Sequence, residues 1–286
     1  MNNNRKIKFT KMHGAGNDYI YIDCFATPVD SLGDISQLAI KMSDRHFGVG
    51  SDGLVLIMPS DNGCDVRMRM LNSDGSEAEM CGNASRCVAK YAYDHKIVKN
   101  KEFKLQTKGG IKYITVYTDA DDTVTSATVN MGAPILSPAD IPVKASGDKV
   151  VASALEVDGD SKTMTCVSMG NPHCILFVDG VDDAPVHTLG PKVEVHTAFP
   201  RKTNVEFAHV VSRSLIEMRV WERGAGETMA CGTGACATLV AAALNNLTDR
   251  KATLKLLGGN LEIEWRQSDN NVYMTGPAAY AFTGEF

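Results

Sequence analysis

Two stretches of the chain, 150 residues apart, share one pattern of residues. "VRMRMLNSDGSEAEMCGN" covers Val66–Asn83, and "IEMRVWERGAGETMACGT" covers Ile216–Thr233. Each begins with an alternating run typical of a strand, passes through a glycine-rich turn, and ends in Cys-Gly before a helix-like run. Cys81 therefore aligns with Cys231. The chain contains the same strand–turn–helix unit twice, and this duplication decides the fold.

A weaker similarity lies upstream of each copy. "MHGAGND" (Met12–Asp18) resembles "MGNPH" (Met169–His173), at a separation of 157 residues. The two halves of the chain therefore read as duplicated units. Two such units most simply pack about a pseudo-twofold axis, which would bring the two Cys-Gly helix starts face to face across a cleft.

Short β-like runs dominate the rest of the chain, and only three helices stand out. The expected helices are Ile35–Ser43, Ala84–Tyr93 with one apolar face, and Ala235–Leu244, which is apolar nearly all round and so reads as enclosed by protein. The expected strands are Ile7–Met12, Tyr19–Asp23, Leu54–Met58, Val66–Leu71, Glu102–Thr107, Ile111–Tyr117, Val124–Asn130, Cys174–Val178, Asn204–His209, Leu215–Trp221, Thr253–Leu256, Leu261–Trp265 and Val272–Thr275. The turn at Lys108–Gly110 predicts a hairpin. Many strands with few helices predict an α+β protein, because the strand–helix alternation of a doubly wound sheet is missing.

The repeated Cys-Gly at a helix start suggests a specific chemistry. A helix N-terminus presents N–H groups and a positive dipole end, so it binds a carboxylate and lowers the pKa of a nearby thiol from about 8.5 toward neutrality. Two such ends could hold one carboxylate, with a sulfur on either side of the adjacent carbon. One sulfur would remove the α-proton while the other delivers a proton to the opposite face, as in a two-base racemase or epimerase.

A single Cys-Gly would more simply be a buried, inert thiol. The matched pair favours the functional interpretation for Cys81 and Cys231. The other six cysteines are expected to be structural: 24, 64, 87, 166, 174 and 236.

Composition excludes several classes of protein. A net charge of −5, a pI near 5.8 and scattered Lys and Arg residues argue against binding to nucleic acid or an anionic membrane. The N-terminal stretch has no apolar leader region, and no run is long enough to predict a transmembrane helix, so a cytoplasmic location with reduced cysteines is expected. The absence of a C-x-x-C pair argues against a zinc cluster or a redox dithiol.

The motif "GVGSDG" (Gly48–Gly53) matches the glycine spacing of a dinucleotide-binding loop. That loop requires a strand before it and a helix after it. Here a helix-like run precedes the motif and a strand follows it. We therefore reject nucleotide binding and expect these glycines to shape a loop near the site.

The chain resembles the diaminopimelate epimerase family along essentially its whole length. The motifs that carry the resemblance occur in the family's order: "MHGAGNDY", "GSDG", "NSDGSEAEMCGN", "MGNPH", "TNVEF", "WERGAGET" and "ACGTGAC". The resemblance implies an α+β fold of two pseudo-symmetric domains, each a β-barrel-like sheet wrapped around a central helix, with the active site in the cleft between them. The N-terminal half is expected to span residues 1–126, with residues 276–286 returning to it, and the C-terminal half residues 127–275.

The resemblance also implies the site and its substrate. Cys81 and Cys231 match the acid/base pair, and the N–H groups of Gly82, Asn83, Gly232 and Thr233 match the carboxylate cradle. His173 and Glu222 match residues that tune the thiols. The remaining substrate-binding residues would be Asn17, Asn72, Asn171, Asn204, Glu222 and Arg223. Diaminopimelate carries an amino acid group at each end, and Arg and Asn side chains suit its distal carboxylate and ammonium. No cofactor and no metal are implied.

Two positions depart from the family pattern. Ala84 stands where the family usually has glycine, and Gly53 stands where some members have glutamine. A racemase of another amino acid such as histidine, a non-catalytic amino-acid-binding protein, and a thiol redox or metal module remain alternatives. The expected partner is a small amino acid substrate; the oligomeric state stays open, with a homodimer as one option.

Overall fold

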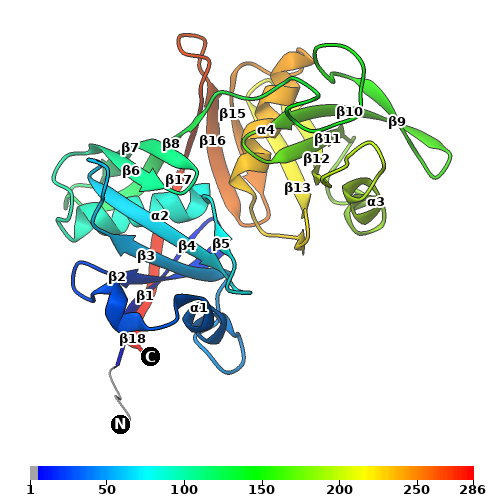
Figure 1. Cartoon of the computed structure of the whole chain (residues 1–286). Helices are drawn as coiled ribbons and strands as arrows, with labels where there is room; N and C mark the ends of the chain where they lie inside the picture. Colours follow the sequence, from blue (N-terminus) through cyan, green and yellow to red (C-terminus); the bar gives the residue numbers. More distant parts are fainter. Residues whose placement is uncertain (1–5) are drawn as a thin grey trace. The chain divides into compact units, whose positions relative to one another are not determined.

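The computed structural model describes residues 6–286, and the chain divides into two compact units. The first unit contains the residues up to Val129 together with Gly276–Phe286, and the second contains Asn130–Thr275. The first unit is thus built from both ends of the chain, as the blue and red strands of Figure 1 show. Residues 1–5, part of the stretch read as lacking a leader, lie outside the described residues.

The elements follow the same order in each half. Residues up to Val129 and the C-terminal segment form β1 (Lys8–Gly14), β2 (Asn17–Asp23), the 3-10 helix Val29–Leu32, α1 (Ile35–Ser43), β3 (Gly53–Met58), β4 (Val66–Asn72), β5 (Glu77–Ala78), α2 (Gly82–Asp94), β6 (Glu102–Thr107), β7 (Gly110–Thr118), most of β8 (Val124–Gly132) and β18 (Ala279–Glu285). The second unit holds β9 (Ser153–Val157), β10 (Asp160–Ser168), β11 (Pro172–Phe177), α3 (Val186–Glu194), β12 (Asn204–Ser212), β13 (Leu215–Glu222), β14 (Gly226–Glu227), α4 (Gly232–Leu244), β15 (Lys251–Leu256), β16 (Gly259–Trp265) and most of β17 (Val272–Pro277).

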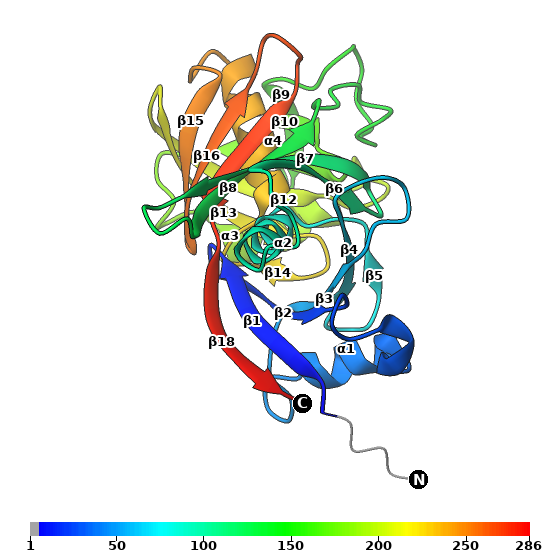
Figure 2. The same cartoon turned by 90° about the vertical axis from the view of Figure 1, so that its left-hand side faces the viewer.

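The strand pairing is the same in both units. In the first, β1–β2 is antiparallel, β2–β3 parallel, β3–β4 antiparallel and β4–β6 parallel, followed by the antiparallel pairs β6–β7 and β7–β8. The series from β10 to β17 repeats every step. β18 pairs with β1 as β9 pairs with β10, so the last strand of the chain completes the first unit (Figure 2). The predicted α+β class with two similar halves is confirmed.

Each sheet curls around one helix. α2 packs against β1, β2, β3, β4 and β7, and Figure 2 shows it nearly end-on with these strands around it. α4 packs in the same way against β10, β11, β12, β13, β15 and β16. A second apolar layer covers the other side of the sheets under α1 and α3. Because strands such as β3 are buried on both faces, they read as continuous apolar runs rather than alternating ones.

The burial of α2 extends beyond its predicted apolar face. All of residues 82–93 are buried, including Arg86 and Lys90. Lys90 pairs with Asp94 at 2.9 Å, and Arg86 donates to the Pro277 carbonyl at 3.2 Å and to Asn83 Oδ1 at 2.9 Å. A buried charge is tolerated when partners satisfy it, and those partners are tertiary, so the helical periodicity did not reveal them.

The helix α3 was also absent from the sequence prediction. It contains Gly190 and Pro191, which normally signal a helix end. Gly190 is needed there because a Cβ would lie 2.8 Å from Trp221 Cβ. Tertiary packing on β13 thus overrides the local signal. Among the described residues, no helix combines the length and apolar character needed to cross a bilayer.

Candidate active site

Cys81 and Cys231 occupy the same place in their units. Each is the N-cap of a 13-residue helix, with extended backbone angles: φ −134° and ψ 126° at Cys81, φ −113° and ψ 106° at Cys231. The following residues, Gly82 and Asn83 or Gly232 and Thr233, form the first helical turn, where N–H groups have no acceptor within the helix. Each unit therefore places a thiol beside a ready anion-binding helix end.

In the first unit the Cys81 thiol contacts neutral amides. Its Sγ donates to Asn17 Oδ1 at 3.4 Å, and Asn83 Nδ2 donates to the same oxygen at 3.2 Å. Asn17 comes from the start of β2, so a Gly-rich turn and a helix start meet here. Asn72 lies at the end of β4, where its amide donates to Ser76 Oγ at 3.0 Å within the turn.

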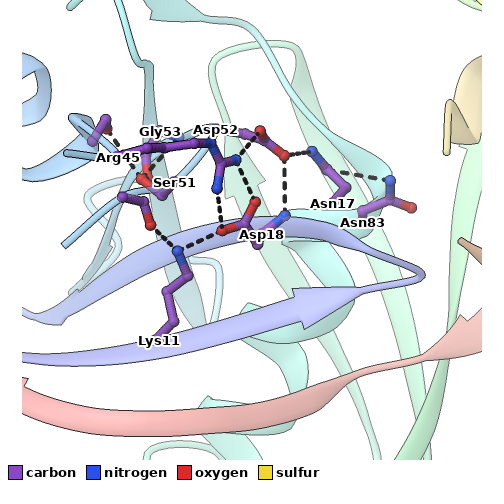
Figure 3. Close-up of polar contacts among 10 residues, drawn as sticks. Lys11, Asn17, Asp18, Arg45, Ser51, Asp52, Gly53 and Asn83 are labelled. Carbon is purple, nitrogen blue, oxygen red and sulfur yellow. Dashed lines mark hydrogen bonds and ion pairs between the residues drawn. The ribbon is translucent and has the colours of Figure 1, made fainter. Parts of the chain in front are cut away.

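A network of charged side chains contacts Asn17 through Asp52 (Figure 3). Asn17 Nδ2 donates to Asp52 Oδ2 at 2.6 Å, and Arg45 bridges Asp52 and Asp18 at 2.8 Å to each. Lys11 Nζ pairs with Asp18 at 2.5 Å. Burial raises the pKa of Asp18, but the hydrogen bonds and charges of Arg45 and Lys11 outweigh it, so that pKa lies below its ordinary value. Asp52 belongs to "GSDG", which α1 precedes and β3 follows, the reverse of a dinucleotide-binding loop.

In the second unit the Cys231 thiol is surrounded by ionisable groups. Its Sγ lies 3.5 Å from Thr233 Oγ1, and Asn171 Nδ2 donates to that hydroxyl at 3.3 Å. The other end of the Asn171 amide, Oδ1, lies 3.0 Å from His173 Nε2. His173 is fully buried, and its Nδ1 lies 2.7 Å from Oε1 of Glu206, which is also fully buried.

The pKa of Cys231 contradicts the expectation of a lowered thiol pKa. Burial raises the pKa of this thiol well above its ordinary value, and the negative charges of Glu222 and Glu206 raise it further. Burial also raises the pKa of Glu222, although hydrogen bonds from Thr228 and Cys231 partly oppose this. Desolvation and like charge outweigh the helix end at this position, because the thiol is only 5% exposed.

Asn204 and Arg223 lie on neighbouring segments, Asn204 at the start of β12 and Arg223 just after β13. Asn204 Nδ2 donates to the Pro172 carbonyl at 2.8 Å, and its Oδ1 accepts from the Arg223 backbone N–H at 2.9 Å. Arg223 Nη1 donates to the Arg201 carbonyl at 3.1 Å. The Asn204 amide thus ties together the segments that carry His173 and Arg223.

The structure explains the two departures from the family pattern. A Cβ at Gly53 would lie 2.1 Å from the Leu71 carbonyl oxygen, so this backbone accepts glycine alone. Ala84 is fully buried, whereas a Cβ at the matching Gly234 would lie 2.6 Å from Glu206 Oε1. In the first unit the register position of Glu206, opposite Val220, is taken by Val55, opposite Met70, so this strand position carries no carboxylate.

Sequence reasoning missed Glu206, Asp52, Arg45 and Asp18. A signal for Glu206 exists, since it lies in the strand run "NVEFA" among residues that are all buried. A charge in such a run is expected only where a partner satisfies it. Among residues 6–286, no group of three His, Cys, Asp or Glu side chains is arranged to hold a metal ion.

Comparison with known proteins identifies close relatives. The sequence matches the diaminopimelate epimerase family over residues 9–137 and 165–281. It is 54% identical to a diaminopimelate epimerase of Acetivibrio thermocellus over 279 residues, covering 98% of each chain. It is 53% identical to one of Methanococcus maripaludis, covering 98% of this chain and 99% of the relative.

Solved structures of more distant proteins share the fold. A Bacillus anthracis phenazine biosynthesis protein of the PhzF family aligns with a TM-score of 0.70 and 15% identity, over 99% of both chains. A hydroxyproline epimerase of Agrobacterium vitis aligns with a TM-score of 0.67 and 13% identity, over 99% of this chain and 91% of that one. The fold is therefore common to several proteins, whereas the family match and the full-length relatives are specific: the chain belongs to the diaminopimelate epimerase family.

Proposed function

We propose that this protein is a diaminopimelate epimerase that converts LL-2,6-diaminopimelate to meso-diaminopimelate by proton transfer between two thiols. The observation that carries the proposal is the repeated Cys-Gly helix start, at Cys81 and Cys231, in a chain whose relatives are full-length diaminopimelate epimerases. Inversion at a carbon needs one group to remove the proton and another to deliver a proton to the opposite face. Cys81 and Cys231 are these two groups.

The helix ends supply the stabilisation that the reaction needs. Removing an α-proton moves negative charge onto the substrate carboxylate. The N–H groups of Gly82, Asn83, Gly232 and Thr233 form the carboxylate cradle, and preformed donors of this kind act on the charge as it develops. The proposed mechanism uses no cofactor and no metal.

The ionisable groups around Cys231 can set the protonation state of its thiol. Glu222 is half-buried, its pKa is raised by desolvation, and it is a hydrogen-bond partner of the thiol. His173 reaches the same region through Asn171 and Thr233. We assign Glu222 and His173 the role of tuning the thiols, because a buried thiol must lose its proton before it can act as a base.

The polar side chains around the helix ends would recognise the rest of the substrate. Arg223 supplies a guanidinium suited to a carboxylate, and the carboxylate of Glu222 suits an ammonium group. The amides belong to Asn17, Asn72, Asn171 and Asn204. A site with such groups rejects a substrate that lacks the distal amino acid group, since the polar groups would then lose their partners.

The test is exchange of the α-proton with solvent. Reduced protein is incubated in D2O with LL-diaminopimelate and, separately, with L-histidine, L-proline and L-glutamate, and deuterium at the α-carbon is followed by NMR. Deuterium and meso product from diaminopimelate alone are expected. Exchange with another amino acid instead would show that diaminopimelate is not the substrate. Binding without any exchange would show that the protein binds amino acids but does not epimerise them.

The two thiols are tested separately. Cys81→Ala and Cys231→Ala are each expected to lower turnover by at least about a thousandfold, because one half of the proton transfer is lost. The matched control is Cys64→Ala, since Cys64 is a partly exposed thiol in a turn after β3, and it should retain wild-type turnover. Epimerisation at a rate near wild type by either the Cys81→Ala or the Cys231→Ala protein would contradict the two-base assignment.

A further inference from the structure

The orientation of two side-chain amides beside Cys81 is determined by their anchors. A carboxylate only accepts hydrogen bonds, so the amide atom of Asn17 that lies 2.6 Å from Asp52 Oδ2 has to be the nitrogen. A guanidinium only donates, so the amide atom of Asn83 that lies 2.9 Å from Arg86 Nη2 has to be the oxygen. The usual ambiguity between the two ends of an amide is therefore absent at both residues.

This orientation places the side-chain oxygen of Asn17 against the Cys81 thiol. With its nitrogen on Asp52, Asn17 presents Oδ1 to Asn83 Nδ2 at 3.2 Å and to Cys81 Sγ at 3.4 Å. A carbonyl oxygen has no proton to give, so the sulfur must be the donor. A thiolate at this position would instead meet the negative end of the amide dipole.

We propose that Asp52 is a positioning residue that, through Asn17, keeps Cys81 protonated in the resting protein, so that Cys81 begins as the proton donor. The role of Cys81 as proton donor rests on the proposed function, because only a proton-transfer reaction would use that proton. Asp52 itself touches neither the thiol nor the substrate-binding helix end; it acts through the amide of Asn17.

The Asp52 carboxylate has further partners in a partly exposed network. Asp52 Oδ1 accepts from Arg45 at 2.8 Å, and Oδ2 also accepts from the Asp18 backbone N–H at 3.1 Å. Arg45 and Lys11 in turn hold Asp18 (Figure 3). The charges of Lys11 and Arg45 balance those of Asp18 and Asp52. The network therefore orients the Asn17 amide without adding net charge.

Tyr21 on β2 and Cys87 on α2 are further titratable groups that interact with Cys81 within the first unit, and α2 also carries the permanently charged Arg86. Burial raises the pKa of Tyr21 well above its ordinary value and that of Cys87 to about 11. Both therefore stay neutral near physiological pH, where the charge state of Cys81 is to be measured.

The experiment measures the thiol and not turnover. The full-length protein, without substrate, is alkylated with iodoacetamide across a range of pH, and modification of the Cys81 peptide is followed by mass spectrometry. The midpoint of the pH–rate profile is the readout, because a change in access alters the rate without moving the midpoint. Asp52→Asn is expected to lower the midpoint and to raise the thiolate fraction at neutral pH about threefold to tenfold, as one hydrogen bond would. The freed Asn17 amide can then turn its nitrogen to the sulfur.

Two further variants separate orientation from charge. Asp18→Asn removes the same charge from the same network but leaves the Asn17–Asp52 bond, so its midpoint should stay near wild type. Asn17→Ala changes no charge and removes the facing oxygen, so its midpoint should fall. An unchanged midpoint in both Asp52→Asn and Asn17→Ala, or an equal fall in Asp18→Asn, would overturn the proposal. Thermal unfolding confirms that each variant is folded, and absence of epimerase activity would leave this result standing.

Discussion

At the scale of single residues, the two thiols have different surroundings although their helices begin alike. Cys81 is partly exposed and donates to the neutral amide of Asn17. Cys231 is buried, with two glutamates that raise its pKa. A duplicated backbone thus carries two thiols in chemically distinct environments, one beside a neutral amide and one beside two glutamates.

Removing the charge of Glu206 should change the pKa of Cys231. Glu206→Gln removes one of the charges that raise the pKa of that thiol, so its pKa should fall. Loss of the charge-assisted bond to His173, 2.7 Å long, should also lower kcat/KM about tenfold or more. Alkylation of the Cys231 peptide as a function of pH checks the first effect and steady-state kinetics the second. Glu156→Gln, an exposed glutamate on β9 of the same unit, is the control. A Cys231 profile that is identical in Glu206→Gln and wild type would contradict the assigned influence.

Glu222 should make the stability of the protein depend on pH. Burial raises its pKa in the folded protein, whereas the pKa of an unfolded glutamate is about 4.3. Below about pH 4.3 both states hold the proton and there is no penalty. Above it the unfolded state gains free energy by losing the proton while the folded state keeps it, so the contribution of Glu222 to stability is lost as pH rises through the folded pKa.

Glu222→Gln removes this dependence. The free energy of unfolding of the variant should therefore rise relative to wild type as pH increases above about 4.3, whatever constant offset the loss of the Thr228 hydrogen bond adds. Urea unfolding of both proteins across this range measures it. A difference between the two proteins that does not change with pH would show that Glu222 titrates normally.

At the scale of elements, the helix starts carry both the likeness and the difference between the units. α2 and α4 have the same length and the same extended N-cap, but the third residue after the cysteine is Ala84 in one and Gly234 in the other. The partner strand decides this, since β12 places a carboxylate oxygen where a methyl group would go and β3 does not. The residue choice at a helix start is thus determined by the strand it faces.

Gly234→Ala is expected to destabilise the protein by about 1–3 kcal/mol, because the new methyl would press on Glu206, which is held by its hydrogen bond to His173. The matched substitution in the other unit, Ala84→Gly, should cost about 0.5–1 kcal/mol through helix propensity and lost contact. Guanidinium unfolding compares the two. An equal or smaller loss in Gly234→Ala would mean that Glu206 moves aside, and a crystal structure of the variant would show where.

At the scale of the whole molecule, the chain ends meet in one unit. β18 pairs with β1 from Lys8↔Glu285 to His13↔Ala279, and Phe9 lies edge-on to Phe282 at 6.1 Å. In the second unit β9 fills the same place from within the sequence. The first unit therefore depends on the last strand of the chain, whereas the second unit is continuous.

Deleting residues 279–286 should affect the two units unequally. β1 would lose a neighbouring strand and Phe9 its cover, so hydrogen exchange in β1 and β2 should accelerate by a factor of about ten or more. Protection in β10–β13 should persist, because within residues 6–286 the partners of these strands belong to their own unit. Exchange followed by mass spectrometry resolves the two regions, and the full-length chain is the control. Equal loss in both units would show that they unfold as one.

The sequence by itself determined the features that depend on local pattern. Alternating and apolar runs located most strands, the hairpin at Lys108–Gly110, and α1 at its observed bounds. The repeat at a separation of 150 residues predicted the two similar halves and selected Cys81 and Cys231 from eight cysteines. Motif order predicted the family, which the comparisons confirm. Such signals survive in a linear sequence because periodicity, turns and helix starts each depend on residues close together in the chain.

Only the tertiary structure decided how the site residues are held and charged. Arg86 and Lys90 are buried because carbonyls and carboxylates from other segments satisfy them, and α3 forms across Gly190-Pro191 because β13 packs against it. The raised pKa of Cys231 comes from burial and from Glu222 and Glu206, and the orientation of Asn17 comes from Asp52, which lies 35 residues away. Desolvation, charge pairing and hydrogen-bond direction depend on which segments the fold brings together, and no local pattern of residues contains that information.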